Sequence, residues 1–340
     1  MRRHSPELDG ESRAARSARR VKVALFGTGS PLSVAALEAL APEANVVGVV
    51  LPLPRASVPL VGMWQAARVR TRQRPFAESA QRLGIPILSM LPRGDAELAA
   101  ALGASAPDLI CVASFPYVLR EPLLSLPRLG GLNVHPSLLP RHRGPDPLFW
   151  TYLHGEREAG ITVHRLTARA DAGAILAQER VSVGHGQPLG EVYLDLSARG
   201  ARLLAECVQR LADGSVSETA QDESQATNEP SPARDTWRRQ PIERSTELMW
   251  HFLSGLGGQR TALLTDLGGE PVAHGAAIAH RLEKPSREPG AIERRADRLR
   301  LHCTDGFVEL ALPSFAAQAR VALERIRRRV TSGGFGAHRR

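Results

Sequence analysis

Apolar runs of strand length alternate with helix-like segments through the first 135 residues, and this alternation is the strongest constraint on the fold. Residues 21–27 form an apolar run that ends in a glycine, and the apolar spacing of residues 31–41 suits a helix that Pro31 opens. The further strand-like runs are residues 45–51, 85–88, 108–113 and 131–135, and the further helix-like segments are residues 76–83 and 95–102. Strands that alternate with helices at this spacing form right-handed βαβ units. We therefore predict an α/β fold with a doubly wound, mostly parallel sheet.

The second half of the chain changes character. A long helix is expected over residues 189–212, and the polar stretch 213–240, rich in Ser, Thr, Gln, Glu and Pro, has the composition of a linker. A helix over residues 245–254 and a series of strand-like segments follow, and they predict a small β-rich, barrel-like domain. The strand-like segments are residues 260–265, 271–282, 290–302 and 307–312. The expected organisation is a basic tail at 1–20, an α/β domain at 21–212, a linker at 213–240, the β-rich domain at 241–320 and a second basic tail at 321–340.

The net charge of +9 is concentrated in the two tails. Residues 1–20 hold six arginines against three acidic residues, and residues 321–340 hold six arginines against one acidic residue. The body of the chain is therefore nearly neutral. We expect both tails to be disordered and solvated, and contact with RNA is the alternative.

Several classes of protein are disfavoured. No stretch of about 18 apolar residues exists, so no membrane span is expected, and the Arg-rich start lacks the apolar core of a secretory signal. The three cysteines are scattered, and no His/Cys/Asp spacing is typical of a metal site, so we predict reduced thiols, no metal and a cytoplasmic protein. The turn Gly27-Thr28-Gly29 is followed by Leu32 where a dinucleotide fingerprint has glycine, so we predict a tight turn and no NAD.

The segment GLNVHPSLLPRHRGPDP, residues 131–147, carries the most chemistry. Asn133 and His135 alternate on a strand and so point to the same side, at the strand end where an open α/β sheet places its ligand. An amide can donate to a developing oxyanion, and an imidazole can carry the proton of an attacking amine. The proline-stiffened loop that follows is expected to line the site. Its candidate residues are Ser137, Leu138, Leu139, Pro140 and Gly144.

The stretch NVHPSLLPRHRG resembles the active-site segment of the 10-formyltetrahydrofolate-dependent formyltransferase family, which reads roughly N-x-H-P-S-L-L-P-x-x-R-G. Downstream, residues 160–163 (GITV) and 171–176 (DAGAIL) are similar to the family's G-x-T and D-x-G elements. The resemblance covers roughly residues 20–312. It implies a formyltransferase-like Rossmann variant and transfer of a formyl group from 10-formyltetrahydrofolate, as co-substrate, to an amine.

The resemblance also implies roles for residues. Asn133 would stabilise the tetrahedral oxyanion, His135 would shuttle the proton, and Asp171 would support the imidazolium. The folate would lie against two loops, largely through backbone groups. The residues of these loops are Phe115, Pro116 and Tyr117, and Thr167, Ala168, Arg169 and Ala170. Three positions beside Asp171 depart from the family pattern, namely Arg165, Ala168 and Ala174. Three further histidines are expected to be surface or packing residues, namely His142, His154 and His164.

The acceptor amine is a separate question. Asp235-Thr236-Trp237 and residues 289–310 resemble the accessory domain of methionyl-tRNA formyltransferases, and four arginines there would suit tRNA phosphates. These arginines are Arg294, Arg295, Arg298 and Arg300. However, residues 52–75, although basic, lack the Gly-rich basic loop of those enzymes, and residues 144–147 look closer to formyltransferases of other amines, such as amino-sugar nucleotides. We expect a tRNA acceptor, with the amino-sugar nucleotide or hydrolysis of formyltetrahydrofolate as alternatives.

Overall fold

The computed structural model describes residues 20–53, 59–232, 244–257, 264–265, 267, 271–315, 317–319 and 321–322, with only the backbone for residues 59–70, 265 and 271. The two predicted tails lie almost entirely outside these residues, as does the element Asp235-Thr236-Trp237. The chain divides into two compact units. Unit 1 comprises Met1–Pro147, Ala159–Val181 and Tyr193–Glu229, and unit 2 comprises Leu148–Glu158, Ser182–Val192 and Pro230–Arg340.

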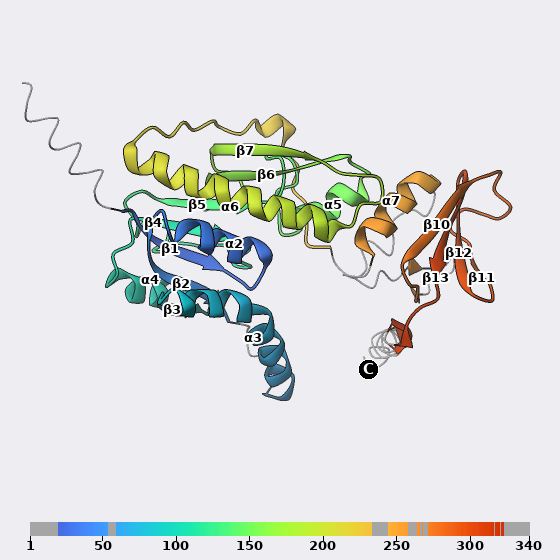
Figure 1. Cartoon of the computed structure of the whole chain (residues 1–340), viewed down its shortest axis with the longest axis horizontal. Coiled ribbons are helices and arrows are strands. Elements are labelled where there is room, and N and C mark those ends of the chain that lie inside the picture. Colours follow the sequence, from blue (N-terminus) through green and yellow to red (C-terminus); the bar gives the residue numbers. More distant parts are fainter. Residues whose placement is uncertain are drawn as a thin grey trace, which may run out of the picture. The chain divides into compact units, whose positions relative to one another are not determined.

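A seven-stranded sheet in the order β3-β2-β1-β4-β5-β6-β7 lies at the centre of unit 1 (Figure 1). Its strands are β1 (Lys22–Gly27), β2 (Asn45–Pro52), β3 (Ile87–Met90), β4 (Leu109–Ala113), β5 (Gly131–His135), β6 (Glu158–Arg165) and β7 (Ile175–Ser182). The pairs from β3 to β5 are parallel, and β5 pairs with β6 antiparallel. The predicted doubly wound, mostly parallel sheet is therefore confirmed.

Helices flank this sheet (Figure 1). They are α2 (Pro31–Leu40), α3 (Pro59–Arg82), α4 (Asp95–Gly103) and α6 (Leu189–Asp213), whereas the short helix α5 (Pro147–Leu153) lies almost wholly in unit 2. The side chain of Ser30 caps α2 by accepting from the Ser33 N–H, as expected for a helix that Pro31 opens. On the face that α4 covers, Ala24 and Phe26 of β1 pack into one buried cluster with Leu98 and Leu102.

Helix α3 begins at Pro59 and continues past Pro75, whereas the sequence predicted a helix only over residues 76–83. Arginine stands at every second position from Arg68 to Arg74, just before Pro75, and this spacing is not helical, so the pattern did not reveal the helix. A proline inside a helix removes one backbone hydrogen bond and normally indicates a boundary. Here the helix runs through that position.

The turn Gly27-Thr28-Gly29 packs tightly against α3. A Cβ on Gly29 would lie 1.4 Å from the carbonyl oxygen of Arg72, so only glycine fits. The Ser33 hydroxyl accepts from the Thr28 N–H at 2.9 Å and donates to the Ala113 carbonyl at 2.6 Å, which joins the ends of β1 and β4. The glycines therefore serve a strand-to-helix turn.

The predicted linker at 213–240 differs from the structure over its first part. After α6 ends at Asp213, residues 214–229 return along unit 1 and belong to it. Thr219 forms an antiparallel bridge with Ile175, and a short 3₁₀-helix, η1 (Glu223–Gln225), follows. The polar composition that indicated a solvated linker supplies hydrogen bonds to two loops of unit 1 instead.

Unit 2 combines pieces from three parts of the chain. Helix α7 (Thr246–Leu256) is capped by Ser245 and packs its aromatic face on α5, where the rings of Phe149 and Phe252 lie 5.8 Å apart. A four-stranded antiparallel sheet in the order β10-β13-β12-β11 and a small sheet of β8 and β9 complete the described part. The strands are β8 (Leu264–Thr265), β9 (Pro271–Val272), β10 (Ala277–Leu282), β11 (Ile292–Arg294), β12 (Arg298–Cys303) and β13 (Gly306–Ala311). The β-rich character is confirmed, although the unit also includes residues 148–158 and 182–192.

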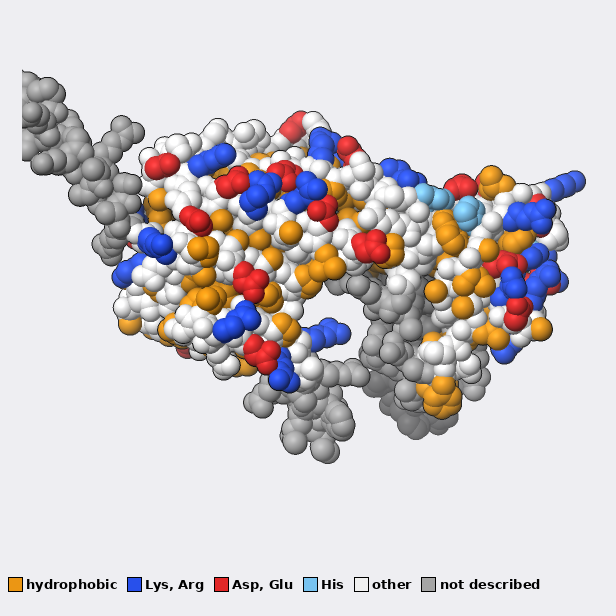
Figure 2. Space-filling model, viewed as in Figure 1, with side chains coloured by type: hydrophobic (Ala, Val, Ile, Leu, Met, Phe, Trp, Pro, Cys, Tyr) orange, Lys and Arg blue, Asp and Glu red, His pale blue; other side chains and the backbone are white. Residues whose placement is uncertain are grey.

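The arginines of this sheet are largely paired with carboxylates. Arg298 and Arg300 both contact Glu309, at 2.6 and 2.8 Å, and Arg295 contacts Glu293 at 3.2 Å. Figure 2 shows blue and red side chains interleaved over this part of the surface. The basic strand predicted from the sequence is therefore mostly neutralised by its neighbours. Separately, no helix within the described ranges is long and apolar enough to cross a membrane.

Candidate active site

Asn133 and His135 lie at the carboxyl end of β5, where the alternation of a strand places both side chains on one side. In the antiparallel register with β6, Asn133 lies opposite His164 and His135 opposite Thr162. His135 is buried, with 5% of its surface exposed. The parallel strands β1 and β4 end at this same edge, so these two residues lie where the sequence predicted.

Asp171 comes from the loop after β6 and faces both residues. Its Oδ1 atom lies 3.3 Å from the Asn133 Nδ2 and 3.6 Å from the His135 Nδ1, and its Oδ2 atom accepts from the Gly144 N–H at 3.0 Å. The backbone of Asp171 has φ +52°, a left-handed conformation that aspartate tolerates better than most residues. The structure thus brings together the three residues predicted to be catalytic.

The two ring nitrogens of His135 have different partners. Nε2 lies 2.8 Å from the carbonyl oxygen of His142, which can only accept, so Nε2 carries the hydrogen of the neutral ring. Nδ1 is therefore the basic nitrogen, and it faces Asp171. Burial lowers the pKa of His135, although Asp171 and the His142 carbonyl partly offset this effect. The ring is thus neutral at pH 7 and has a carboxylate beside the atom that would gain a proton.

Burial alone would raise the pKa of Asp171, but its neighbours outweigh this effect. The ring of His135, the contact with His164 and the Gly144 N–H together lower the pKa of Asp171 to about 2. Each of these neighbours favours the charged carboxylate. Asp171 is therefore ionised throughout the physiological range.

His164, expected from the sequence to be a packing residue, belongs to the same cluster. Its Nδ1 lies 2.8 Å from the Arg165 carbonyl and therefore carries the hydrogen, which leaves Nε2 to accept from the Asn133 Nδ2 at 3.0 Å. The two hydrogens of the Asn133 amide are thus directed at His164 and Asp171. The alternation of His164 with Thr162 along β6 is the sequence signal that could have placed the two side chains on one face, and the register with β5 places His164 directly opposite Asn133.

The loop after β5 is held by hydrogen bonds to β6. The hydroxyl of Thr162 donates to the Ser137 carbonyl at 2.7 Å and accepts from the Leu139 N–H at 3.3 Å. The Ser137 hydroxyl donates to the Arg141 carbonyl at 2.8 Å. A Cβ on Gly160 would lie 2.2 Å from Leu138, so that glycine makes room for the loop. These contacts hold residues 137–139 of the predicted loop against β6, directly after the strand that ends at His135.

The two loops predicted to bind folate, residues 115–117 and 167–170, both adjoin the hydrophobic core of unit 1. Phe115 packs edge-to-face on Phe26, with ring centroids 5.3 Å apart, and is therefore partly a core residue. Tyr117 packs on Phe115, and its hydroxyl donates to the Leu53 carbonyl at 2.5 Å. Residues 167–170 are exposed, and Leu166 before them packs against the same cluster as Phe115. The core thus anchors both loops.

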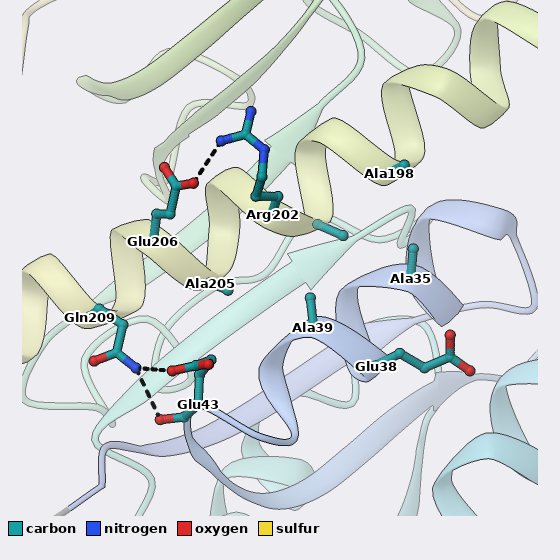
Figure 3. A pocket seen from close by; sticks show the side chains of 10 residues that line it. Ala35, Glu38, Ala39, Glu43, Ala198, Arg202, Ala205, Glu206 and Gln209 are labelled. Atoms are coloured by element: carbon teal, nitrogen blue, oxygen red, sulfur yellow. Dashed lines mark hydrogen bonds and ion pairs between the residues drawn. The ribbon is translucent and has the colours of Figure 1, made fainter.

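A separate pocket of unit 1 lies between α2 and α6 (Figure 3). It has a volume of about 580 Å³, and its floor is formed by alanines such as Ala35 and Ala201. At its rim, the Gln209 amide bonds to the backbone and side chain of Glu43. None of the residues that line it belongs to the cluster around His135, so this pocket is not the candidate active site.

Most of this chain is similar to known proteins. The model of the family described as formyl transferase matches residues 20–208. A methionyl-tRNA formyltransferase of Chlorobium limicola is 33% identical over 242 residues, which cover 69% of this chain and 74% of that protein. A methionyl-tRNA formyltransferase of Anaeromyxobacter dehalogenans is 32% identical over 278 residues, which cover 80% and 85%.

A solved structure has a similar fold over most of this chain. The crystal structure of an N-formyltransferase from Helicobacter canadensis, in complex with folinic acid and dTDP-3-aminofucose, superposes with a TM-score of 0.59. The match covers 86% of this chain and all of that one, at 14% identity. At this identity the comparison concerns the fold alone.

Proposed function

Because this chain belongs to the formyl transferase family, we propose that it transfers a formyl group from 10-formyltetrahydrofolate to the amino group of initiator methionyl-tRNA. The observation that supports the catalytic part is the convergence of Asn133, His135 and Asp171 at one edge of the sheet. An amide donor, a neutral imidazole and an ionised carboxylate are the groups that acyl transfer to an amine requires.

In the proposed reaction, the acceptor amine attacks the formyl carbon of the folate. The amine nitrogen becomes positively charged and must lose a proton, and the Nδ1 atom of His135 accepts it. The imidazolium then lies against Asp171 Oδ1, which stabilises its charge as in other carboxylate–histidine pairs. The proton is returned to the departing folate nitrogen, and the C–N bond to the folate breaks.

The oxyanion would be stabilised by Asn133. Its amide hydrogens are directed at His164 and Asp171, and Asp171 Oδ1 also faces His135. As Nδ1 of His135 gains its proton, it competes with Asn133 for that oxygen. An N–H of Asn133 then becomes available to the developing oxyanion, which couples proton transfer to charge stabilisation.

The folate is proposed to bind against residues 115–117 and 167–170. The support is the family membership and the anchoring of both loops on one core cluster, which keeps their backbone groups in a defined place. Recognition of a pteridine by backbone groups does not depend strongly on side-chain identity. The departures at Arg165, Ala168 and Ala174 are therefore compatible with folate binding.

The acceptor is proposed from the extent of the similarity. The relative from Anaeromyxobacter dehalogenans aligns over 278 residues, more than the 189 that the family model matches, so the similarity extends beyond the region that this model covers. That relative and several others carry the name methionyl-tRNA formyltransferase. An amino-sugar nucleotide acceptor and hydrolysis are the alternatives.

The deciding experiment offers the acceptors in parallel. Purified protein is incubated with 10-formyltetrahydrofolate and either charged initiator tRNA or an amino-sugar nucleotide, and formylated product and free formate are both measured. We expect formylmethionyl-tRNA at low salt. Transfer to the sugar nucleotide without transfer to tRNA would overturn the acceptor, and formate without any formylated amine would indicate a hydrolase.

A further inference from the structure

Gln221 joins the two loops that surround His135. Its side-chain Nε2 donates to the carbonyl oxygens of Asp171 and Gly173, at 2.9 and 2.7 Å. Its Oε1 accepts from Nε and Nη2 of Arg143, at 3.0 and 2.6 Å. Carbonyls accept and guanidinium groups donate, so this network sets the orientation of the amide without ambiguity. All four hydrogen-bonding positions of the Gln221 amide are used.

Arg143 carries the connection into the loop after β5. Its side chain is buried, with 2% of its surface exposed, and it also contacts Glu223 at 2.9 Å. The residue before it, His142, supplies the carbonyl that accepts from His135 Nε2. Gln221 is therefore hydrogen-bonded on one side to the backbone of Asp171, whose carboxylate faces His135 Nδ1. On the other side it is hydrogen-bonded to Arg143, in the loop whose His142 carbonyl accepts from His135 Nε2.

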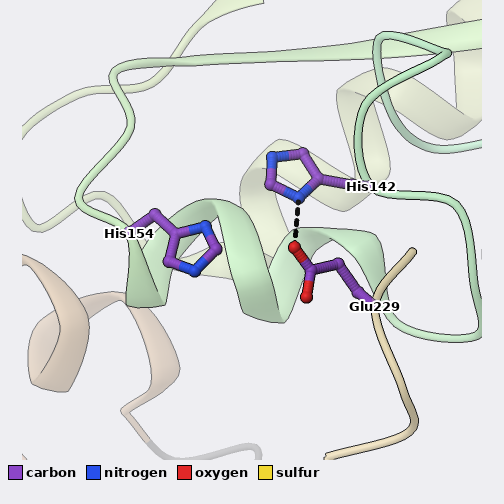
Figure 4. Close-up of side chains that lie close together, drawn as sticks. All are labelled: His142, His154 and Glu229. Carbon is purple, nitrogen blue, oxygen red and sulfur yellow. Dashed lines mark ion pairs between the residues drawn. The ribbon is translucent and has the colours of Figure 1, made fainter. Parts of the chain in front are cut away.

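Residues that follow Gln221 form further hydrogen bonds with the loop after β5. The Thr227 hydroxyl accepts from the His142 N–H at 2.8 Å, and the Thr227 carbonyl accepts from the Arg143 N–H at 3.0 Å. The Glu229 N–H donates to the Arg143 carbonyl at 2.7 Å, and its carboxylate lies 3.7 Å from the ring of His142 (Figure 4). Thus residues 219–229, named here the strap, lie along both loops.

We propose that Gln221 is a positioning residue for the proposed formyl transfer, which sets the distance between Asp171 and His135 through its bonds to Asp171, Gly173 and Arg143. The inference rests on the proposed function. It assigns a role in the reaction to a residue of a segment whose composition indicates only a linker.

The physical need for such a residue follows from the loop that carries Asp171. Leu166 anchors the start of the loop on the core, but residues 167–170 are exposed and Asp171 has a left-handed backbone, so the part of the loop that presents Asp171 requires a further contact. Small displacements of a reacting group have large effects on rate. A side chain that bonds two backbone carbonyls of the loop and a buried guanidinium supplies the missing constraint.

Two variants and a control test the proposal. Gln221→Ala removes every bond, whereas Gln221→Glu keeps an acceptor for Arg143 but cannot donate to the carbonyls of Asp171 and Gly173. Gln209→Ala is the control. The Gln209 amide on α6 also joins distant segments of unit 1, by hydrogen bonds to Glu43, but it lies at the α2–α6 pocket and not in the cluster around His135. We expect kcat to fall about tenfold to a hundredfold in both Gln221 variants and to stay unchanged in Gln209→Ala.

A second measurement separates positioning from folding and from the proposed function. Burial is the largest influence on the pKa of His135 and lowers it, and Asp171 is the group whose charge raises it. Displacing Asp171 should therefore lower the pKa of the His135 ring, which NMR titration of the folded protein measures without any substrate.

An unchanged kcat together with an unchanged His135 pKa in Gln221→Ala would overturn the proposal. Should the Ala variant not fold, the same two measurements on Gln221→Glu decide. A wild-type protein that transfers no formyl group would contradict the proposed function alone, since the titration still tests the position of Asp171.

Discussion

At the scale of single residues, the site is a set of competing hydrogen bonds around one carboxylate oxygen. Asp171 Oδ1 lies within 3.6 Å of donors or rings from Asn133, His135 and His164. While both rings are neutral only Asn133 donates to this oxygen, because the facing nitrogens of His135 and His164 carry no hydrogen. Protonation of His135 adds a second donor and redistributes the bonds. The catalytic cycle is therefore expected to depend on each of these side chains separately.

Replacing Asn133 or His135 by alanine should lower kcat by at least about a hundredfold, because an oxyanion donor or a proton shuttle is lost. Formyl transfer to charged tRNA is the measurement, and circular dichroism checks that the variants fold. Asn45→Ala and His154→Ala provide the matched controls, since these exposed residues lie outside the cluster. Activity near that of the wild type in either site variant would show that the assigned site is wrong.

The pH dependence of the reaction should reflect the buried imidazole. Burial lowers the pKa of His135, so the neutral base persists as the pH falls through about 6.5 and is lost only below that value. The acid limb of kcat/KM should therefore lie below about pH 6.5. Asp171→Asn removes a charge that raises this pKa, so the limb should move to still lower pH while kcat falls. A shift of the acid limb to higher pH in Asp171→Asn would contradict the assignment of His135 as the base. Titration of the acceptor amine affects the wild type and the variant equally.

At the scale of elements, the loop after β5 depends on a close backbone approach by the strap. Gly144 has φ +123°, and a Cβ there would lie 2.1 Å from the Glu229 carbonyl oxygen. The same glycine donates its N–H to Asp171. The glycine is thus required both by its own backbone conformation and by the neighbour that packs on it.

Gly144→Ala should lower the free energy of unfolding by about 3 kcal/mol, because strain in the backbone adds to the clash with the strap. Gly214→Ala is the control, since that residue also has a positive φ of +76° but nothing within 4 Å of its Cβ position. Its cost should be only about 1 kcal/mol. Urea unfolding of both variants measures the difference, and equal losses would argue against a tight strap.

At the scale of the whole molecule, the boundary between the units determines how the acceptor can be tested. A chain that ends at residue 240 would lack α7, on which Phe149 and Tyr152 pack, with Tyr152 stacked on His251 at 4.8 Å. Truncation would therefore expose aromatic side chains of unit 2 as well as remove a binding surface. Charge changes in the intact chain are the cleaner test.

Arg294→Glu should raise the KM for methionyl-tRNA and make the salt dependence of binding shallower, while kcat at saturation is retained. Arg294 is exposed on β11, and each phosphate contact that is lost reduces the slope of log affinity against log salt by about one. Arg210→Glu, an exposed site at the end of α6, is the control with the same charge change. A salt-independent KM in the wild type would instead favour a small acceptor, which neutralises few phosphate charges.

The sequence by itself determined the α/β fold, the position of Asn133 and His135 at a strand end and the family. Each of these depends on a local pattern, either apolar periodicity or a contiguous motif, and local patterns can be recognised in the sequence itself. The course of α3 through Pro75 could not be predicted from the sequence, because the arginines before Pro75 stand at every second position rather than with a helical period.

Only the tertiary structure decided the hydrogen-bond partners of His164, Gln221 and Arg143. His164 reaches Asn133 through the register of β5 with β6, and Gln221 reaches Asp171 across 50 residues of chain. The pairing of Arg298 and Arg300 with Glu309 likewise arises from the register of β12 with β13. Polar side chains have many possible partners, and the partner that each one takes is set by contacts between distant segments, which no local pattern records.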